Sequence, residues 1–272
     1  MVKMGTVWDR TVEVLNGRTG MIASIALLGM LVPSVVRDGF VAFATPGTSS
    51  FALVAGLLTI LALVAMIWAQ LAIVAIATDP ATDAAAARRQ GSARVLPALG
   101  LTIVLSIVAV VFALPPIFAL ALAGFDFTAA AGGRPVATPG VGGAAMFSAL
   151  YLLVYLALAI WAGARLAVLN PVIVNERLGL GAIRRSVQLT RGLTWRIIGV
   201  FILFAIVLIV TGWAAQSVTG VVLRLALGAD GVALATFLSS IFATIVTTIF
   251  TALAAVFTAQ LYVAVREKHA VS

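Results

Sequence analysis

The sequence predicts an all-α, polytopic integral membrane protein with six transmembrane helices. Hydrophobic residues make up 63% of the chain and charged residues only 10%, and the mean hydropathy is +1.20. A soluble protein cannot bury that much apolar surface behind so few charges. A bilayer core requires about 20 apolar residues per helix. Six segments meet this requirement, at about 19–36, 51–77, 95–123, 145–169, 197–223 and 232–265.

A recurring triplet predicts that the six helices form three related hairpins. Ala-(Gln/Arg)-Leu begins at Ala69, Ala164 and Ala259, so successive copies are 95 residues apart. Each copy lies near the end of a long apolar segment, and such internal repeats indicate one structural unit used several times. We therefore expect a single membrane domain, 1–272, built from repeat units at about 5–77, 79–169 and 175–266.

Positive charge is concentrated on one side of this topology. Cytoplasmic loops are enriched in Lys and Arg, and 14 of the 17 basic residues fall near the termini or in the second and fourth connections. We therefore expect a multi-pass protein of the bacterial plasma (inner) membrane with both termini in the cytoplasm. The net charge of +8 predicts anionic phospholipids as partners. Nucleic acid is not expected, because the charges are divided among loops without a groove-reading motif.

Interfacial amphipathic helices are expected at 5–16, 81–90 and 175–191, on the cytoplasmic side. In the third, polar side chains fall within a narrow arc at about 100° per residue, and apolar side chains lie away from them. The polar group comprises Arg177, Arg184, Arg185, Gln188 and Arg191. A helix with this pattern lies in the membrane interface, so we expect these side chains to contact lipid headgroups. Topology alone also places arginines here, and that explanation stays open.

Gln70, Arg165 and Gln260 are the central residues of the three triplets. A polar side chain at this depth must find a partner or extend toward the headgroups. If the three return helices are neighbours, these side chains could form a polar ring, with Arg165 reaching Glu176 or a lipid phosphate. Alternatively, each binds a backbone carbonyl of an adjacent surface helix, which is a common arrangement in helix packing.

The connection after the fourth helix resembles a known family over roughly 30 residues. The motifs are Arg165-Leu166, Asn170-Pro171-Val172-Ile173-Val174-Asn175-Glu176 and Gly181-Ala182-Ile183-Arg184-Arg185-Ser186-Val187-Gln188-Leu189-Thr190-Arg191-Gly192. They are similar to the glycerophosphodiester phosphodiesterase membrane-domain family, which includes YciC-like six-helix bacterial membrane proteins. The resemblance implies the six-helix layout. The His-Arg-Gly motif and metal-binding carboxylates of the phosphodiesterase are absent, so we expect this chain to lack the catalytic domain.

The sequence offers no recognisable catalytic set, and we expect neither enzyme activity nor a metal or cofactor. There is no cysteine, and the single histidine, His269, lies in the terminal tail, so triads that use these residues cannot form. Acids are absent from the six apolar cores. We expect Asp38, Asp126 and Asp230 in outer loops, where each is near one arginine: Arg37, Arg134 and Arg224.

The predicted function is therefore a non-catalytic integral membrane protein that binds anionic phospholipids or a membrane partner, a second copy included. Envelope homeostasis is one process that such a protein could serve. The alternative is a transporter or channel for a small solute or lipid, with a path lined by the hydroxyls of the last helix. These hydroxyls belong to Ser239, Ser240, Thr244, Thr247, Thr248 and Thr251. Small hydroxyl residues also commonly mediate helix packing.

Overall fold

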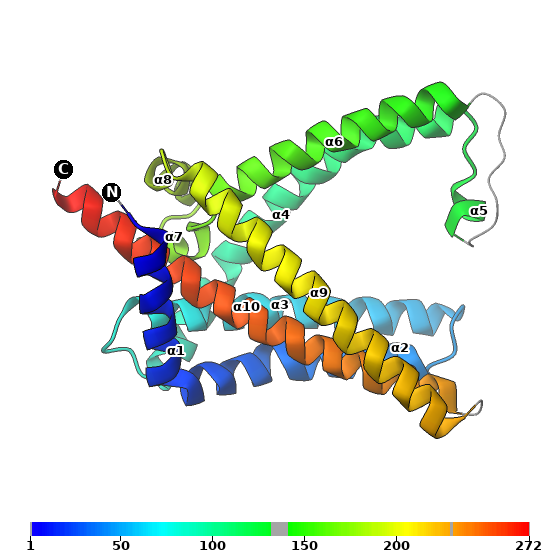
Figure 1. Cartoon of the computed structure of the whole chain (residues 1–272), viewed down its shortest axis with the longest axis horizontal. Coiled ribbons are helices and arrows are strands. Elements are labelled where there is room, and N and C mark those ends of the chain that lie inside the picture. The colour runs from blue at the N-terminus through cyan, green and yellow to red at the C-terminus, as the bar shows by residue number, and fades with distance from the viewer. Residues whose placement is uncertain (1, 132–140, 229–230, 272) are drawn as a thin grey trace. The chain divides into compact units, whose positions relative to one another are not determined.

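The computed structural model confirms an all-helical, polytopic membrane architecture (Figure 1). It describes residues 2–131, 141–228 and 231–271, and these ranges contain no strand. Six helical spans are long and apolar enough to cross a membrane: Met4–Phe43, Ser49–Thr78, Ala84–Leu122, Gly142–Asn175, Thr194–Leu227 and Val232–Lys268.

The first span consists of three helical segments. Helix α1 (Met4–Ala26) is followed by the π-helical segment η1 (Leu27–Leu31) and by α2 (Val32–Phe43). Arg18 leaves helical geometry, with φ −135° and ψ 19°, and the chain bends sharply there (Figure 1). The predicted surface helix at 5–16 is therefore the first part of α1, and a kink separates it from the apolar part.

The prediction that Asp38 lies in an outer loop, beside Arg37, is wrong. Helix α2 continues to Phe43, and α3 (Ser49–Thr78) begins after a short connection in which the Thr48 hydroxyl accepts a hydrogen bond from the Phe51 amide at 3.1 Å. This is a standard N-terminal cap. Arg37 and Asp38 consequently lie within a membrane-spanning helix and not in a loop.

Helix α4 (Ala84–Leu122) is continuous, so the separate helix predicted at 81–90 is wrong. The helix also continues through Pro115 and Pro116. A proline removes one amide donor from the helix. Pro116 therefore leaves the Phe112 carbonyl, four residues earlier, without its usual partner. The Tyr151 hydroxyl donates to that carbonyl at 2.8 Å. Such substitute donors from a neighbouring helix allow prolines inside membrane helices.

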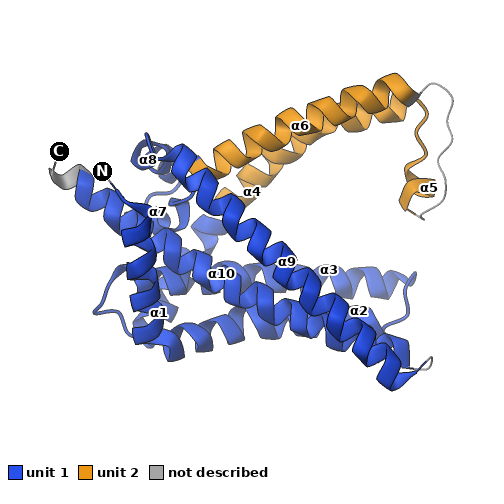
Figure 2. Ribbon diagram, viewed as in Figure 1, with its two compact units in different colours: residues 1–99, 165–272 blue, residues 100–164 orange. Residues whose placement is uncertain are grey.

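The chain forms two compact units, shown in different colours in Figure 2. Unit 1 contains residues 1–99 and 165–272, and unit 2 contains residues 100–164. In unit 2, α6 (Val141–Arg165) pairs with α4 through hydroxyl-to-carbonyl hydrogen bonds, and the short helix α5 (Phe127–Ala131) begins at Asp126. A hydrogen bond from the Thr128 hydroxyl lowers the pKa of Asp126 below its ordinary value.

The rest of unit 1 follows α6. Two short helices, α7 (Leu169–Asn175) and α8 (Gly181–Leu189), precede the long helices α9 (Thr194–Leu227) and α10 (Val232–Val271). The predicted helix at 175–191 is therefore wrong in extent. Arg177 interrupts it with a positive φ of 56°, and Gly192 ends the following turn with φ 82°. These left-handed conformations cannot belong to a right-handed helix.

The most completely buried part of unit 1 lies where the C-terminal part of α3 packs against α7 and α10. Residues 71–77 of α3 are almost completely buried, as are residues 171–174 of α7 and most of residues 255–262 of α10. The remaining apolar surface of these helices is largely exposed, as expected for side chains that face lipid. This buried region supports the functional residues described next.

Candidate functional site

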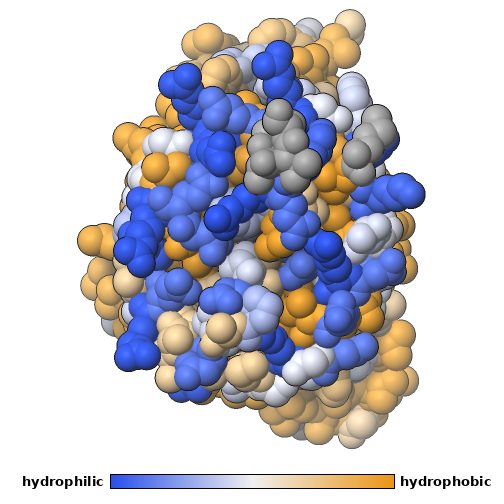
Figure 3. Space-filling view, turned by 90° about the vertical axis from the view of Figure 1, so that its left-hand side faces the viewer, coloured by the Kyte–Doolittle hydropathy of each residue, from blue (hydrophilic) through white to orange (hydrophobic). Residues whose placement is uncertain are grey.

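The predicted site residues lie at one end of unit 1, which we call the basic end. It consists of the start of α1, the C-terminal end of α3, helices α7 and α8, and the last turns of α10 (Figure 1). Figure 3 shows this face, on which many hydrophilic side chains are gathered and apolar side chains surround them. Sixteen of the 17 basic residues belong to unit 1. Those on the segments named above include Arg10, Arg18, Arg184, Arg185 and Arg266.

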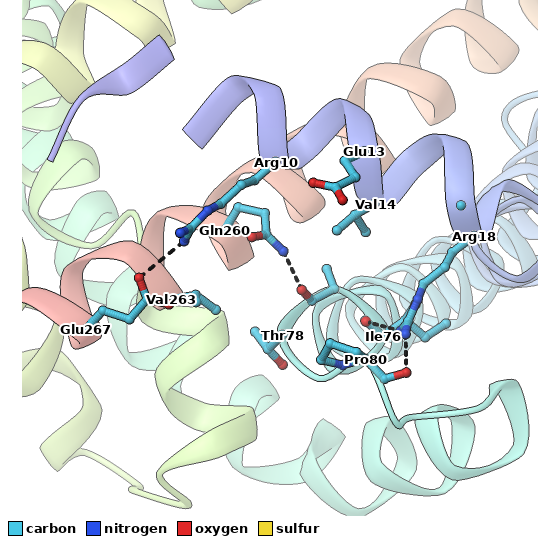
Figure 4. Close-up of a pocket in the computed structure, with 12 residues that line it drawn as sticks. Arg10, Glu13, Val14, Arg18, Ile76, Thr78, Pro80, Gln260, Val263 and Glu267 are labelled. Atoms are coloured by element: carbon cyan, nitrogen blue, oxygen red, sulfur yellow. Dashed lines mark hydrogen bonds and ion pairs between the residues drawn. The ribbon is translucent and has the colours of Figure 1, made fainter. Parts of the chain in front are cut away.

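Gln260 caps the C-terminal end of α3 from the neighbouring helix α10. Its side chain is buried, and its amide nitrogen donates to the Ala77 carbonyl at 2.6 Å. The last four carbonyls of a helix have no partner within that helix, so Gln260 satisfies one of them. The buried donor and buried acceptor hold α10 against α3 at this level (Figure 4).

Arg18 supplies the remaining cap of α3, from the kink in α1. Its guanidinium donates to the carbonyls of Ile76 at 2.7 Å and Asp79 at 3.0 Å, and also to the Pro80 carbonyl. A cation at a helix C-terminus is also attracted by the negative end of the helix dipole. The kink in α1 therefore places the positive charge of Arg18 beside the C-terminal carbonyls of α3.

A polar pocket of about 580 Å³ lies between α1, α3 and α10 (Figure 4). Gln260 and Arg18 line it, together with Glu13 and an ion pair between Arg10 and Glu267 at 3.2 Å. That ion pair is exposed on both sides, so it adds little to stability. It does connect the first helix with the last and thereby holds the two ends of the chain close together.

Gln70 binds a different partner from Gln260. Its side-chain oxygen accepts a hydrogen bond from the Asn170 amide at 3.1 Å, and Thr78, further along α3, donates to Asn175 at 3.2 Å. Two side-chain bonds therefore attach α7 to α3. Asn170 was part of the family-like sequence motif, but its link to Gln70 could not be expected from a separation of 100 residues.

Arg165, the last residue of α6, is held through both its backbone and its side chain. Its carbonyl accepts hydrogen bonds from the hydroxyls of Ser186 at 2.9 Å and Thr190 at 3.1 Å, and its guanidinium donates to the Val187 carbonyl at 3.4 Å. The buried side of α8, which consists of Ala182, Ser186 and Leu189, packs here. Gln70, Arg165 and Gln260 thus each bind a separate partner.

Glu176, the predicted partner of Arg165, has two other partners. Its carboxylate accepts from the Arg185 guanidinium at 2.8 Å and from the Tyr262 hydroxyl at 3.1 Å. Tyr262 was not among the predicted site residues, although it directly follows the third triplet. A tyrosine in an otherwise apolar segment was the available signal, since a buried hydroxyl requires a partner.

The predicted headgroup-binding residues divide into two groups. Arg185 is held by Glu176. The other members, Arg177, Arg184, Gln188 and Arg191, are exposed. Arg184 and Gln188 lie one turn apart on α8, whereas Arg177 precedes the helix and Arg191 follows it. Within the described residues, none of the three exposed arginines forms an ion pair.

The apolar side of this segment also differs from the sequence expectation. Leu180, in the turn before α8, is 68% exposed, and Ile183 and Val187 are only half-buried. The buried side chains of α8 pack on protein and not on lipid. Arg134, Asp230 and the side chain of His269 lie outside the described residues, so the outer arginine–acid pairs expected there are not described.

The family resemblance stays a prediction. Comparisons with protein-family models, with curated proteins and with solved structures give no match.

Proposed function

We propose that this protein is a non-catalytic module of the bacterial inner membrane that binds anionic phospholipid headgroups at its basic end. In this proposal both termini lie in the cytoplasm. The observation that supports it is a set of three exposed arginines, Arg177, Arg184 and Arg191, which have no carboxylate partner among the described residues. Their segment is attached to the end of α6 by two hydroxyl-to-carbonyl hydrogen bonds.

The surroundings of these arginines fit the headgroup layer. Trp195, at the start of α9, is 82% exposed, and Leu180 is exposed beside Arg177 and Arg184 in the sequence. Tryptophan is enriched at membrane–water interfaces. Guanidinium groups bind phosphate through paired hydrogen bonds, and each basic residue near an anionic surface contributes about 1 kcal/mol. Exposed apolar side chains and exposed arginines therefore both occur between Arg177 and Trp195.

Lipid binding is tested by removing the exposed arginines and leaving Arg185 with Glu176. We expect the triple substitution R177A/R184A/R191A to weaken binding of phosphatidylglycerol on the order of 100-fold, from about 1 kcal/mol per residue. Native mass spectrometry of the detergent-solubilised protein with added phosphatidylglycerol measures this. Arg224→Ala, an exposed arginine at the far end of α9, is the control. Equal lipid retention by the triple variant and wild type contradicts the proposal.

The proposed orientation has a direct test, because the chain contains no cysteine. Thr45 lies in the short connection between α2 and α3, and Gly179 lies in the turn before α8. Both are exposed. A membrane-impermeant maleimide should label Thr45→Cys in intact cells. It should label Gly179→Cys only after the inner membrane is permeabilised, and the reverse pattern would place the basic end outside.

A further inference from the structure

A charged pair lies inside the membrane-spanning part of unit 1. Arg37 and Asp38, on α2, form an ion pair at 2.7 Å, and their side chains are 38% and 20% exposed. Ionisable side chains within membrane helices are energetically costly and commonly mark a binding site or a transport pathway. The pair also has a neighbour from another helix, because Thr244 of α10 donates to the second Asp38 oxygen at 3.4 Å.

The pair borders a pocket of about 330 Å³ between α2 and α10. Met30 and Met66 also line it, and so do hydroxyl and amide groups that form a wall from α10 and α9: Ser240, Thr244, Thr247, Thr248, Thr251 and Gln216. The volume is at the lower end of the range of about 300–1,000 Å³ that is typical of ligand pockets. Ser239 does not belong to this wall, since it is buried next to Gly220 of α9. Packing therefore explains Ser239 but not the other hydroxyls.

The pocket lies inside the apolar helical spans, between Met30 and Asp38 of the first span and Ser240 and Thr251 of the last. Thr244 is twelve residues from the first residue of α10, which corresponds to about 18 Å along the helix at roughly 1.5 Å per residue. The hydrocarbon core is about 30 Å thick. Gln260, at the basic end, is sixteen residues further along α10. Lipid tails offer no hydrogen-bond partner to polar groups at this depth. The polar groups of the pocket are bound to one another and to carbonyls of α10.

The hydroxyl groups present acceptors to this pocket. Ser240, Thr247 and Thr251 donate their protons to carbonyls of their own helix, at 2.8, 2.9 and 2.7 Å. A hydroxyl has one proton and two lone pairs, so these oxygens retain acceptor capacity. The Asp38 carboxylate adds further acceptors, and the adjacent Arg37 neutralises its charge. The wall therefore suits a ligand that carries several hydrogen-bond donors and no net charge.

We propose that the pocket between α2 and α10 binds a small uncharged polyol and passes it across the membrane. Secondary transporters likewise place their substrate sites near the bilayer midplane. This inference goes beyond headgroup binding at the basic end and does not depend on it. The pocket includes most of the hydroxyls of the transport path that was the alternative prediction from the sequence. It also includes the Arg37–Asp38 pair, which was predicted to lie in a loop.

The proposal is tested by xylitol flux into proteoliposomes, followed by light scattering after an osmotic step. We expect wild-type protein to admit xylitol faster than empty liposomes do. Thr247→Val should lower the protein-dependent rate roughly fivefold, the effect of one lost hydrogen bond of about 1 kcal/mol. Thr247→Ser, which keeps the hydroxyl, should retain most of the rate. Thr236→Val is the matched control, because Thr236 is an exposed threonine of α10 outside the pocket.

A second measurement separates loss of binding from loss of folding. Ser240→Cys places a thiol in the pocket of a chain that has no other cysteine. Xylitol should slow modification of this thiol by a small methanethiosulfonate reagent and leave the modification of Thr236→Cys unchanged. The inference is overturned by wild-type flux equal to that of empty liposomes, by equal flux in Thr247→Val and wild type, or by unprotected Ser240→Cys. The inference is also contradicted if the protein carries a charged amine into the proteoliposomes and added xylitol does not reduce that flux.

Discussion

In unit 1, side chains that are far apart in the sequence bind one another, whereas unit 2 relies on one pair of helices. Arg18 and Gln260 cap α3, and Glu176 connects α8 with α10. In unit 2, the hydroxyls of Ser148, Tyr151 and Tyr155 donate from α6 to three carbonyls of α4. Most large apolar side chains of unit 2 remain exposed. Unit 1 therefore has its own core, and unit 2 depends on lipid to cover its sides.

The comparison predicts that added side-chain volume harms unit 1 far more than unit 2. A Cβ at Gly29 would lie 2.6 Å from the Ala69 Cβ and 3.0 Å from the Ala65 carbonyl oxygen. We expect Gly29→Ala to cost about 1–3 kcal/mol through overpacking and to lower the apparent Tm in detergent by several degrees. Gly163→Ala is the control, because nothing lies within 4 Å of its Cβ. A similar Tm change in both variants contradicts the close approach of η1 and α3.

The second prediction compares two carboxylates of unit 1. Glu176 has two hydrogen-bond partners and is partly buried, whereas Glu267 forms an exposed ion pair with Arg10. Glu176→Ala leaves the partners unsatisfied and should cost roughly 1–3 kcal/mol. Glu267→Ala should cost roughly 0–1 kcal/mol. Thermal unfolding at fixed lipid and detergent concentration measures both, and equal losses would show that the Glu176 contacts do not connect α8 with α10.

The smallest expected effect concerns unit 2. Tyr151 donates to the carbonyl that Pro116 leaves without an amide partner, so Tyr151→Phe should cost about 1 kcal/mol. In a Pro116→Ala background the restored amide binds that carbonyl, and Tyr151→Phe should then cost less. The double-mutant cycle isolates this coupling. Additive losses in the cycle would mean that the hydroxyl does not replace the missing donor.

The sequence predicted the class of fold, the six spans and the segment in which the exposed arginines lie, because composition and helical period reveal these features. It did not predict that α2 includes Arg37 and Asp38. Charges at the end of an apolar run resemble the start of a loop, and the compensating contact with Thr244 is 206 residues away. Likewise, nothing local indicates that Tyr151 allows α4 to continue through Pro116.

The site residues show the same limit. Gln70, Arg165 and Gln260 were singled out by their repeated position, but each partner comes from a distant segment. The left-handed conformation of Arg177 could not be predicted from the hydrophobic periodicity either. Non-glycine residues rarely adopt this conformation, so a helix through Arg177 was the expected structure. Hydrophobic pattern thus predicts where helices are, whereas the contacts between them depend on which helices become neighbours.

The π-helical turn η1 has a consequence for the membrane pocket. Its wider hydrogen-bonding pattern adds one residue to a turn, and one residue corresponds to about 100° of rotation in the helix that follows. Deleting Leu28 should restore α-helical geometry and rotate α2 so that Arg37 and Asp38 point into hydrocarbon. The one additional residue in η1 therefore determines whether the side chains of Arg37 and Asp38 face hydroxyl groups or lipid acyl chains.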